Sequence, residues 1–252
     1  MADGIGEGAG TSEDSTAGDG VHEFEPHHDA VGDRLNWLRA GVLGANDGLI
    51  STAGIVIGVA AATGESSAIL TAGIAGLTAG AVSMALGEYV SVSTQRDTEV
   101  ALIAKERAEL KEMPEDELAE LEGIYRAKGL SAETARRVAE ELTAHDPLQA
   151  HLDAELGIDE DNLTSPLAAA VSSAISFSVG ASIPILASLV QTQRILAIVV
   201  SVLIGLALTG YVSARLGDAD VRRATARVVL GGLIAMAVTY VVGKLLGTTG
   251  IA

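Results

Sequence analysis

The sequence predicts an all-α membrane protein, with five transmembrane helices and a helical cytoplasmic domain inserted between the second and the third helix. Three observations favour this fold class. Five apolar runs are each long enough to cross the hydrocarbon core of a bilayer, which needs about 20 helical residues. The chain is 48% hydrophobic yet has a formal net charge of -17, which suits a membrane protein with acidic aqueous parts better than one soluble globule. The acidic residues are also unevenly distributed along the chain.

The acidic residues concentrate in two segments. Residues 1–33 carry nine Asp or Glu and no Lys or Arg, and residues 94–163 carry nineteen acidic and eight basic residues. Such segments attract cations and repel nucleic acid. We expect residues 1–33 to form a disordered acidic tail, residues 34–93 to hold the first two spans, residues 94–163 to form the cytoplasmic domain, and residues 164–252 to hold the last three spans.

The five apolar runs define the spans and their orientation. They cover about residues 40–62, 68–93, 166–190, 195–215 and 225–247. Basic residues precede the first span, follow the second and lie between the fourth and fifth, whereas only Arg194 lies between the third and fourth. Because short cytoplasmic loops are enriched in Lys and Arg, we expect the N-terminus and residues 94–163 to be cytoplasmic. The short, cysteine-free, arginine-rich chain favours a prokaryotic cell membrane.

Several classes of site are excluded or disfavoured. The chain has no cysteine, so a bound metal must be held by oxygen, imidazole or thioether groups. There is no phosphate-binding loop of the P-loop type, which argues against ATP-driven pumping. The spacing Glu-x-x-His occurs only at Glu25 and His28, in the tail, which argues against a ferritin-like oxidase. His22, His27 and His28 offer weak metal ligands, although a solubilising tail is the simpler interpretation.

Three residues inside the first two spans are candidate ligands. Asp47 lies within the first apolar run, and a charge there costs at least about 2.5 kcal/mol, so such residues usually face a protein interior and mark an ion path. Met84 and Glu88 are four residues apart in the second run and share one helix face. We expect antiparallel packing of the two spans to bring Asp47, Met84 and Glu88 to a similar depth. Two carboxylates with a thioether suit a divalent cation.

Glycines at four-residue spacing also mark the first two spans. The pairs are Gly44 with Gly48, Gly54 with Gly58, and Gly76 with Gly80. Small residues at this spacing allow membrane helices to approach closely, so we expect tight packing there.

Residues 94–163 show helix signals. We expect helices from Gln95 to Met113, from Pro114 to Lys128, from a Ser131 cap to about Ala144, and from Pro147 to Glu155. Glu106 with Glu109, and Glu117 with Glu120, are carboxylate pairs at three-residue spacing, which repel each other unless a cation bridges them. An acidic solvated face is the alternative for these four glutamates. A domain of about 70 residues has only a small hydrophobic core, so we expect it to pack against the same domain of a second subunit.

Motifs in both regions resemble those of the vacuolar iron transporter family. They are residues 44–49 (GANDGL), 83–89 (SMALGEY), 95–97 (QRD), the helix around Glu106 and Arg107, and residues 155–157 (ELG). The resemblance extends over about residues 34–247. It implies five membrane helices per subunit and a homodimer with the path between subunits. It also implies pore ligands at Asp47 and Met84, and a cytoplasmic metal-binding domain lined by Glu106, Glu109, Glu117, Glu120 and Glu155.

The resemblance further implies a transporter rather than an enzyme, which exports Fe2+ or Mn2+ from the cytosol in exchange for protons, with no organic cofactor. Where eukaryotic members have two methionines just before the last glutamate, this chain has His151 and Leu152. A membrane-anchored metal buffer or sensor without transport is the alternative. The intramembrane carboxylates Asp47 and Glu88 argue against it, because an anchor has no need of costly charges.

Overall fold

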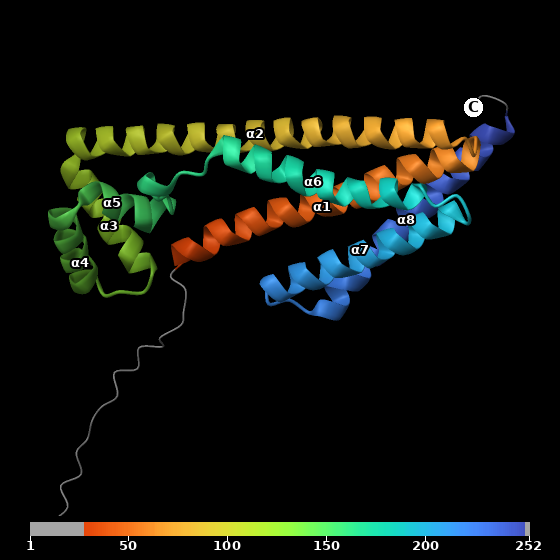
Figure 1. The fold of residues 1–252 in the computed structure, drawn as a ribbon. Helices are drawn as coiled ribbons and strands as arrows, with labels where there is room; N and C mark the ends of the chain where they lie inside the picture. The colour runs from red at the N-terminus through yellow and green to blue at the C-terminus, as the bar shows by residue number, and fades with distance from the viewer. Residues whose placement is uncertain (1–27, 250–252) are drawn as a thin grey trace, which may run out of the picture.

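A computed structural model describes residues 28–249 as a set of helices (Figure 1). The described residues contain no β-strand. The elements are α1 (His28–Ala62), α2 (Ser66–Glu112), α3 (Pro114–Ala127), α4 (Ala132–His145), α5 (Pro147–His151), the π-helix η1 (Leu152–Leu156), the 3-10 helix η2 (Glu160–Asn162), α6 (Pro166–Ser188), α7 (Arg194–Leu216) and α8 (Val221–Thr248). The last six residues of the predicted acidic tail, 28–33, belong to α1. Residues 1–27 of that tail lie outside the described part.

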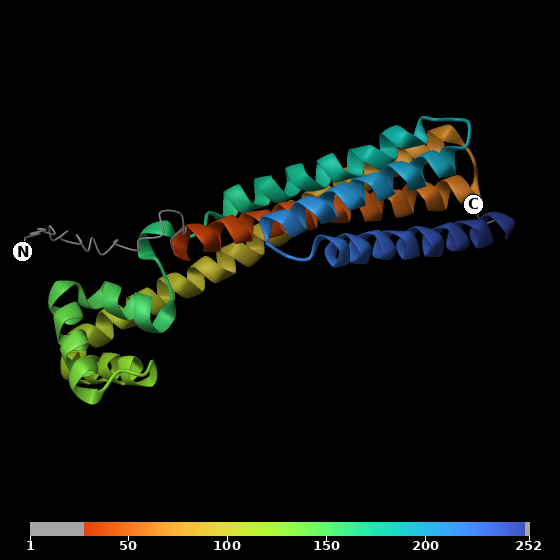
Figure 2. The ribbon, with the colours of Figure 1, turned by 90° about the horizontal axis from the view of Figure 1, so that it is seen from below.

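Five of the helices are long and apolar enough to cross a membrane, which confirms the predicted all-α fold with five membrane-spanning helices. They are α1, α2, α6, α7 and α8, and they lie side by side in one elongated bundle (Figures 1 and 2). Their lipid-facing sides carry exposed apolar side chains such as Leu86, Ile204, Leu208 and Ile234. The protein is therefore an integral membrane protein.

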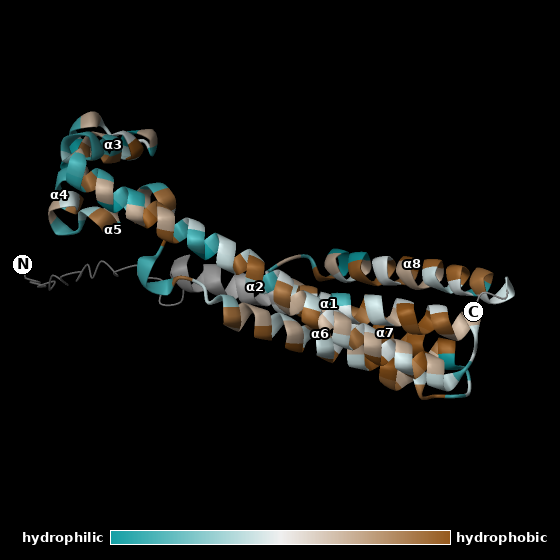
Figure 3. Ribbon diagram, turned by 90° about the horizontal axis from the view of Figure 1, so that it is seen from above, coloured by the Kyte–Doolittle hydropathy of each residue, from teal (hydrophilic) through white to brown (hydrophobic). Residues whose placement is uncertain are grey.

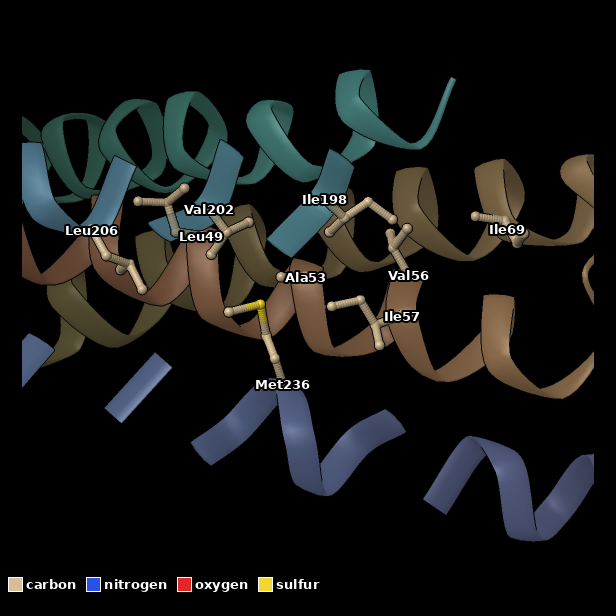
Figure 4. Close-up of a cluster of buried hydrophobic side chains, with 9 residues drawn as sticks. All are labelled: Leu49, Ala53, Val56, Ile57, Ile69, Ile198, Val202, Leu206 and Met236. Carbon is tan, nitrogen blue, oxygen red and sulfur yellow. The ribbon is translucent and has the colours of Figure 1, made fainter. Parts of the chain in front are cut away.

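Helix α1 is the centre of the bundle, because it packs against α2, α6, α7 and α8. Its buried side chains form the main apolar core with residues from α2, α7 and α8 (Figure 4). That core contains Leu49, Ala53, Val56, Ile57, Ile69, Ile198, Val202, Leu206 and Met236.

Close packing of α1 against α6 depends on glycine. A Cβ on Gly48 would lie 2.2 Å from the Phe177 carbonyl oxygen, and a Cβ on Gly180 would lie 2.2 Å from the Ala45 carbonyl oxygen. Any side chain at either position would push the two helices apart. The predicted glycine pairs do mark tight contacts: Gly54 of α1 faces Thr239 of α8, and a Cβ on Gly80 of α2 would meet the Phe177 ring of α6.

Helix α2 is 47 residues long, about twice the length needed to span a bilayer. The second apolar run and the predicted helix from Gln95 are one continuous helix, which projects beyond the bundle (Figure 1). No proline or glycine lies between Glu88 and Met113, so nothing in the sequence interrupts the backbone hydrogen bonds there. The helix ends at Glu112, one residue before the predicted end at Met113, and Pro114 begins α3.

The short helices between α2 and α6 pack on one another and on the C-terminal part of α2. We use the name helical unit for these short helices together with the part of α2 from Leu102 onward. Figure 3 shows this unit as largely hydrophilic and the bundle as largely hydrophobic. The predicted caps are present: Ser131 Oγ accepts a hydrogen bond from the Thr134 N–H, and Pro147 opens α5. The unit and the starts of α1 and α6 lie at the same end of the bundle (Figure 1).

Candidate metal centre

A buried cluster of two glutamates and one histidine lies inside the helical unit. Glu106 comes from α2, Glu117 from α3 and His151 from the end of α5. These side chains are nearly inaccessible, with exposed fractions of 4% for Glu106, 5% for Glu117 and 0% for His151. Each offers one ligand atom, and the three atoms lie within 4.8 Å of one another. Among the residues whose side chains are described, this is the one group of three or more acidic or histidine residues with that geometry.

Local backbone structure places His151 and Glu155 beside this cluster. The Asp146 carboxylate caps the N-terminus of α5 by accepting from the Gln149 N–H, and α5 then widens into the π-helix η1. Gly157 ends η1 in the left-handed conformation, with φ of 62°, which glycine adopts without steric cost. Single π turns are frequent at functional sites. Here the wide turn carries Glu155, and its Oε2 lies 3.7 Å from His151 Nδ1.

The distances in the cluster suit a shared metal ion. His151 Nδ1 lies 2.9 Å from Glu106 Oε1 and 3.6 Å from Glu117 Oε2. Two ligand atoms on one first-row ion, each about 2.1 Å from it, can be at most about 4.2 Å apart. The Nδ1 distances to all three carboxylates fall within that limit.

Hydrogen bonding does not explain the close approach. Both ring nitrogens of His151 and the Oε1 atom of Glu106 are buried and have no hydrogen-bond partner among the described residues. Buried polar atoms without partners are rare and costly. Two carboxylates and an imidazole gathered in this way are ligand groups that a bound cation would partner.

The electrostatics of the cluster favour a positive charge. Burial, together with the nearby carboxylates of Glu155 and Glu117, raises the pKa of the Glu106 carboxyl to about 7. Burial also raises the pKa of Glu117, with Glu120 adding to the rise and His151 opposing it. Each shift means that a negative charge is destabilised at this place. A divalent cation would relieve that cost and release a proton on binding.

The other two predicted glutamates lie outside the buried cluster. Glu109 is half-buried and forms an ion pair with Lys105, with Nζ and Oε2 2.7 Å apart. Glu120 is exposed on α3. The structure thus brings Glu106, Glu117 and Glu155 together and leaves Glu109 and Glu120 at the periphery of the unit.

The three candidate ligands in the spans do not meet within one chain. Asp47 is exposed on α1, whereas Met84 and Glu88 are half-buried on α2. Helix α6 lies between these parts of α1 and α2, because Phe177 packs on Gly48 with its backbone and on Gly80 with its ring. Packing of neighbouring spans alone therefore does not assemble the predicted intramembrane site.

Asn46, next to Asp47, points into the bundle, where α7 holds its side chain. Its Oδ1 atom accepts a hydrogen bond of 2.6 Å from the Thr209 hydroxyl of α7. On the same side, Leu49 is buried in the core. With Asn46 and Leu49 turned inward, Asp47 faces out of the bundle, toward lipid or a second chain.

The comparisons with known proteins agree with these motifs. A model of the VIT family matches residues 38–244, a range that includes both candidate clusters. The chain belongs to the VIT family. It is 43% identical over 231 residues to the vacuolar iron transporter of Acanthamoeba castellanii, covering 90% of this chain and 85% of the relative.

Two plant members of the VIT family are also similar. The vacuolar iron transporter homolog 1 of Oryza sativa subsp. japonica is 41% identical over 221 residues, covering 86% of this chain and 77% of the relative. The vacuolar iron transporter homolog 2 of Arabidopsis thaliana is 37% identical over 221 residues, with 86% and 88% covered. The VIT family consists of transporters, which confirms the expectation that the chain is not an enzyme.

His151 is the residue of the centre that the sequence prediction missed. The sequence singled it out only as a departure from the methionine of the VIT family pattern. A signal was nevertheless present: His151 and Glu155 are four residues apart, so two ligand-forming side chains share a helix face. What the sequence does not show is that α2 and α3 bring Glu106 and Glu117 to the same face.

Proposed function

We propose that the chain transports Fe2+ or Mn2+ across a membrane, exporting the ion from the cytosol in exchange for protons. The observation that carries the proposal is the buried Glu106, Glu117 and His151 cluster, attached by one continuous helix to a bundle that has a carboxylate on its outer face. The names of the VIT relatives support iron as cargo. Carboxylates with an imidazole suit both ions, because carboxylate oxygen favours Mn2+ and imidazole favours Fe2+.

In this proposal the ions first bind to the helical unit. Glu106, Glu117, Glu155 and His151 hold the ion, and the peripheral Glu109 and Glu120 raise its local concentration through their charge. The ion then passes to Asp47, Met84 and Glu88. The coupled proton would return on the carboxylates that the metal vacates, because metal binding needs the deprotonated ligand.

A homodimer would complete the intramembrane site. Asp47 is exposed in the single chain, and a charge facing lipid is costly. The same face of α1 continues into an open apolar groove of about 590 Å³ between α1 and α8, lined by Ser51, Gly54, Gly58, Thr239 and Gly243 among others. A second copy on this face would remove Asp47 from lipid and place the path between subunits.

The dimer can be tested by disulfide cross-linking, because the chain has no cysteine of its own. Leu43, one turn before Asp47, is 57% exposed. Leu43→Cys should form a cross-linked dimer under mild oxidation. Leu208→Cys, at an exposed position on α7, is the matched control and should stay monomeric on a denaturing gel. Equal cross-linking of both variants would contradict the interface.

Transport itself can be tested in liposomes that contain the purified protein and a metal-sensitive dye. A pH gradient should drive Fe2+ or Mn2+ flux in the parent and not in Asp47→Ala. Glu65→Gln, which removes a carboxylate from the exposed loop between α1 and α2, should transport like the parent. Flux in Asp47→Ala at the parent's rate would show that the path assignment is wrong.

The second candidate function is a membrane-anchored metal buffer or sensor. One observation favours it: the described metal-ligating cluster lies outside the spans. Metal binding without flux in the same liposomes would support the buffer.

For orientation, we propose that the N-terminus and residues 94–163 face the cytoplasm, from the basic residues that flank the spans, and that the membrane is a prokaryotic cell membrane. Protease digestion of the helical unit in inverted but not in right-side-out vesicles is the test of the orientation.

A further inference from the structure

Four arginines gather where α7 ends and α8 begins. Arg215 lies in the last turn of α7, and Arg222, Arg223 and Arg227 lie in the first two turns of α8. All four are exposed. None of them forms an ion pair with a described residue. We call these four residues the arginine surface.

Several basic side chains elsewhere in the described part of the chain are engaged within it. In the helical unit, Lys105, Arg107, Arg126 and Arg136 pair with glutamates. At the opposite end of the bundle, Arg194 donates hydrogen bonds to the Gly64 carbonyl oxygen and to the Ser66 hydroxyl. In the arginine surface, by contrast, Arg222, Arg223 and Arg227 lie within two turns of one helix and form no ion pair with a described residue.

The two nearby aspartates do not neutralise this surface. The Asp220 carboxylate caps α8, where it accepts a hydrogen bond of 2.8 Å from the Arg223 backbone N–H. Asp218 lies in the turn before it with φ of 47°, and no ion pair joins either carboxylate to the four guanidinium groups. A net positive charge remains at this end of α7 and α8.

One guanidinium is already held in place beside an aromatic ring. The Arg215 guanidinium carbon lies 5.6 Å from the centroid of the Tyr211 ring, and Arg215 Nε donates a hydrogen bond of 3.3 Å to the Tyr211 hydroxyl. Tyr211 is 45% exposed on α7. Tyrosine is enriched at the level of lipid headgroups, so this pair suits a position at the boundary between lipid and water.

The surface next to the arginines is apolar. Leu208, Val212 and Leu230 are exposed on the membrane side of the four arginines. A free phosphate ion needs only the charges, whereas a lipid needs charges above and an apolar wall below. Guanidinium groups suit phosphate oxygens because they donate two parallel hydrogen bonds.

We propose that the arginine surface binds the phosphate groups of anionic phospholipids at the membrane–water boundary. Arg222, Arg223 and Arg227 would supply most of the charge, and Arg215, held by Tyr211, would supply a guanidinium of fixed orientation. Clusters of basic residues next to a transmembrane helix attract anionic headgroups in this way. The proposal concerns a surface outside the metal path and holds whichever ion is transported.

The test compares lipid binding to the full chain in detergent, measured by native mass spectrometry with added phosphatidylglycerol or phosphatidylcholine. The parent should retain phosphatidylglycerol in preference. Each arginine removed should weaken that binding roughly fivefold, so the triple variant Arg222→Gln, Arg223→Gln, Arg227→Gln should lose about 100-fold. Arg227→Gln alone gives the fivefold readout if the triple variant does not fold.

Two controls make the result specific. Lys244→Gln removes a positive charge from the other end of α8 and should leave both lipids bound as in the parent. Replacing the three arginines by lysine should retain preference for phosphatidylglycerol. The proposal is overturned if the triple variant binds phosphatidylglycerol as the parent does, if phosphatidylcholine binding falls equally, or if millimolar inorganic phosphate displaces the lipid, which would indicate a free-anion site.

Discussion

The helical unit and the membrane bundle hold their candidate ligands in opposite ways. In the unit, one chain brings Glu106, Glu117 and His151 together and buries them. In the bundle, Asp47 faces outward and Met84 and Glu88 lie on a helix that α6 separates from it. The comparison teaches that one chain assembles the proposed binding site of the unit but not the proposed intramembrane site. Substitutions in the unit and in the bundle should therefore affect metal binding and transport separately.

The largest expected effect is the loss of flux in Asp47→Ala. Removing the carboxylate should lower transport by about 100-fold or more, because a charged ligand in a low-dielectric path is lost. The affinity of the helical unit for Mn2+, measured by isothermal titration calorimetry, should stay within about twofold of the parent, since Asp47 lies far from that unit along α1. A parallel loss of affinity would show that the two sites are not separate.

The next effect is expected on binding. His151→Ala should lower the affinity of the helical unit for Fe2+ or Co2+ by about 100-fold or more, because even the loss of a residue that only supports a ligand costs about 10- to 100-fold. His145→Ala, at an exposed position at the end of α4, is the control and should bind as the parent does. Unchanged affinity in His151→Ala would show that the imidazole is not a metal ligand.

The pH dependence of binding should follow Glu106. Its pKa of about 7 means that the carboxyl holds a proton at pH 6 and has lost it at pH 8, so a metal must displace a proton at the lower pH. Mn2+ affinity should therefore fall about tenfold from pH 8 to pH 6 through this group. In Glu106→Gln the affinity should be lower throughout and the fall shallower. The same slope in both proteins would assign the proton to another group.

The smallest effect is expected from Thr209→Val, which removes the hydrogen bond to Asn46. The free energy of unfolding should fall by about 1 kcal/mol, the usual contribution of such a bond. Flux should fall a few-fold because Asp47 loses the support that sets its direction, while metal binding in the unit stays unchanged. Ser201→Ala, whose hydroxyl bonds only within its own helix, is the matched control for both readouts.

The elements of the fold were predictable because their signals are local. Apolar length gave the five spans, and Pro114, Ser131 and Pro147 marked the starts of the short helices. The continuity of α2 was not predicted, because the change from apolar to charged residues after residue 93 suggests a boundary although the backbone has none. The position of α6 between α1 and α2 was also missed, since it depends on contacts between residues more than 90 positions apart.

The candidate site was predictable only in part, for a related reason. The three-residue spacing of the glutamates identified the carboxylates, but it does not distinguish the buried Glu106 from the peripheral Glu109. The fold distinguishes them, because Glu106 faces the interior of the unit and Glu109 pairs with Lys105. His151 was missed because its position beside Glu106 and Glu117 depends on how α5 packs against α2 and α3, which residue types alone do not show.

The length of α2 has one mechanical consequence. Glu88 and Glu106 are 18 residues apart on this unbroken helix, which corresponds to five full turns and about 27 Å of rise. Both carboxylates therefore point in the same direction around the helix axis. A rotation of α2 would turn both together and by the same amount, so whatever turns Glu106 toward a bound ion also reorients Glu88 in the membrane.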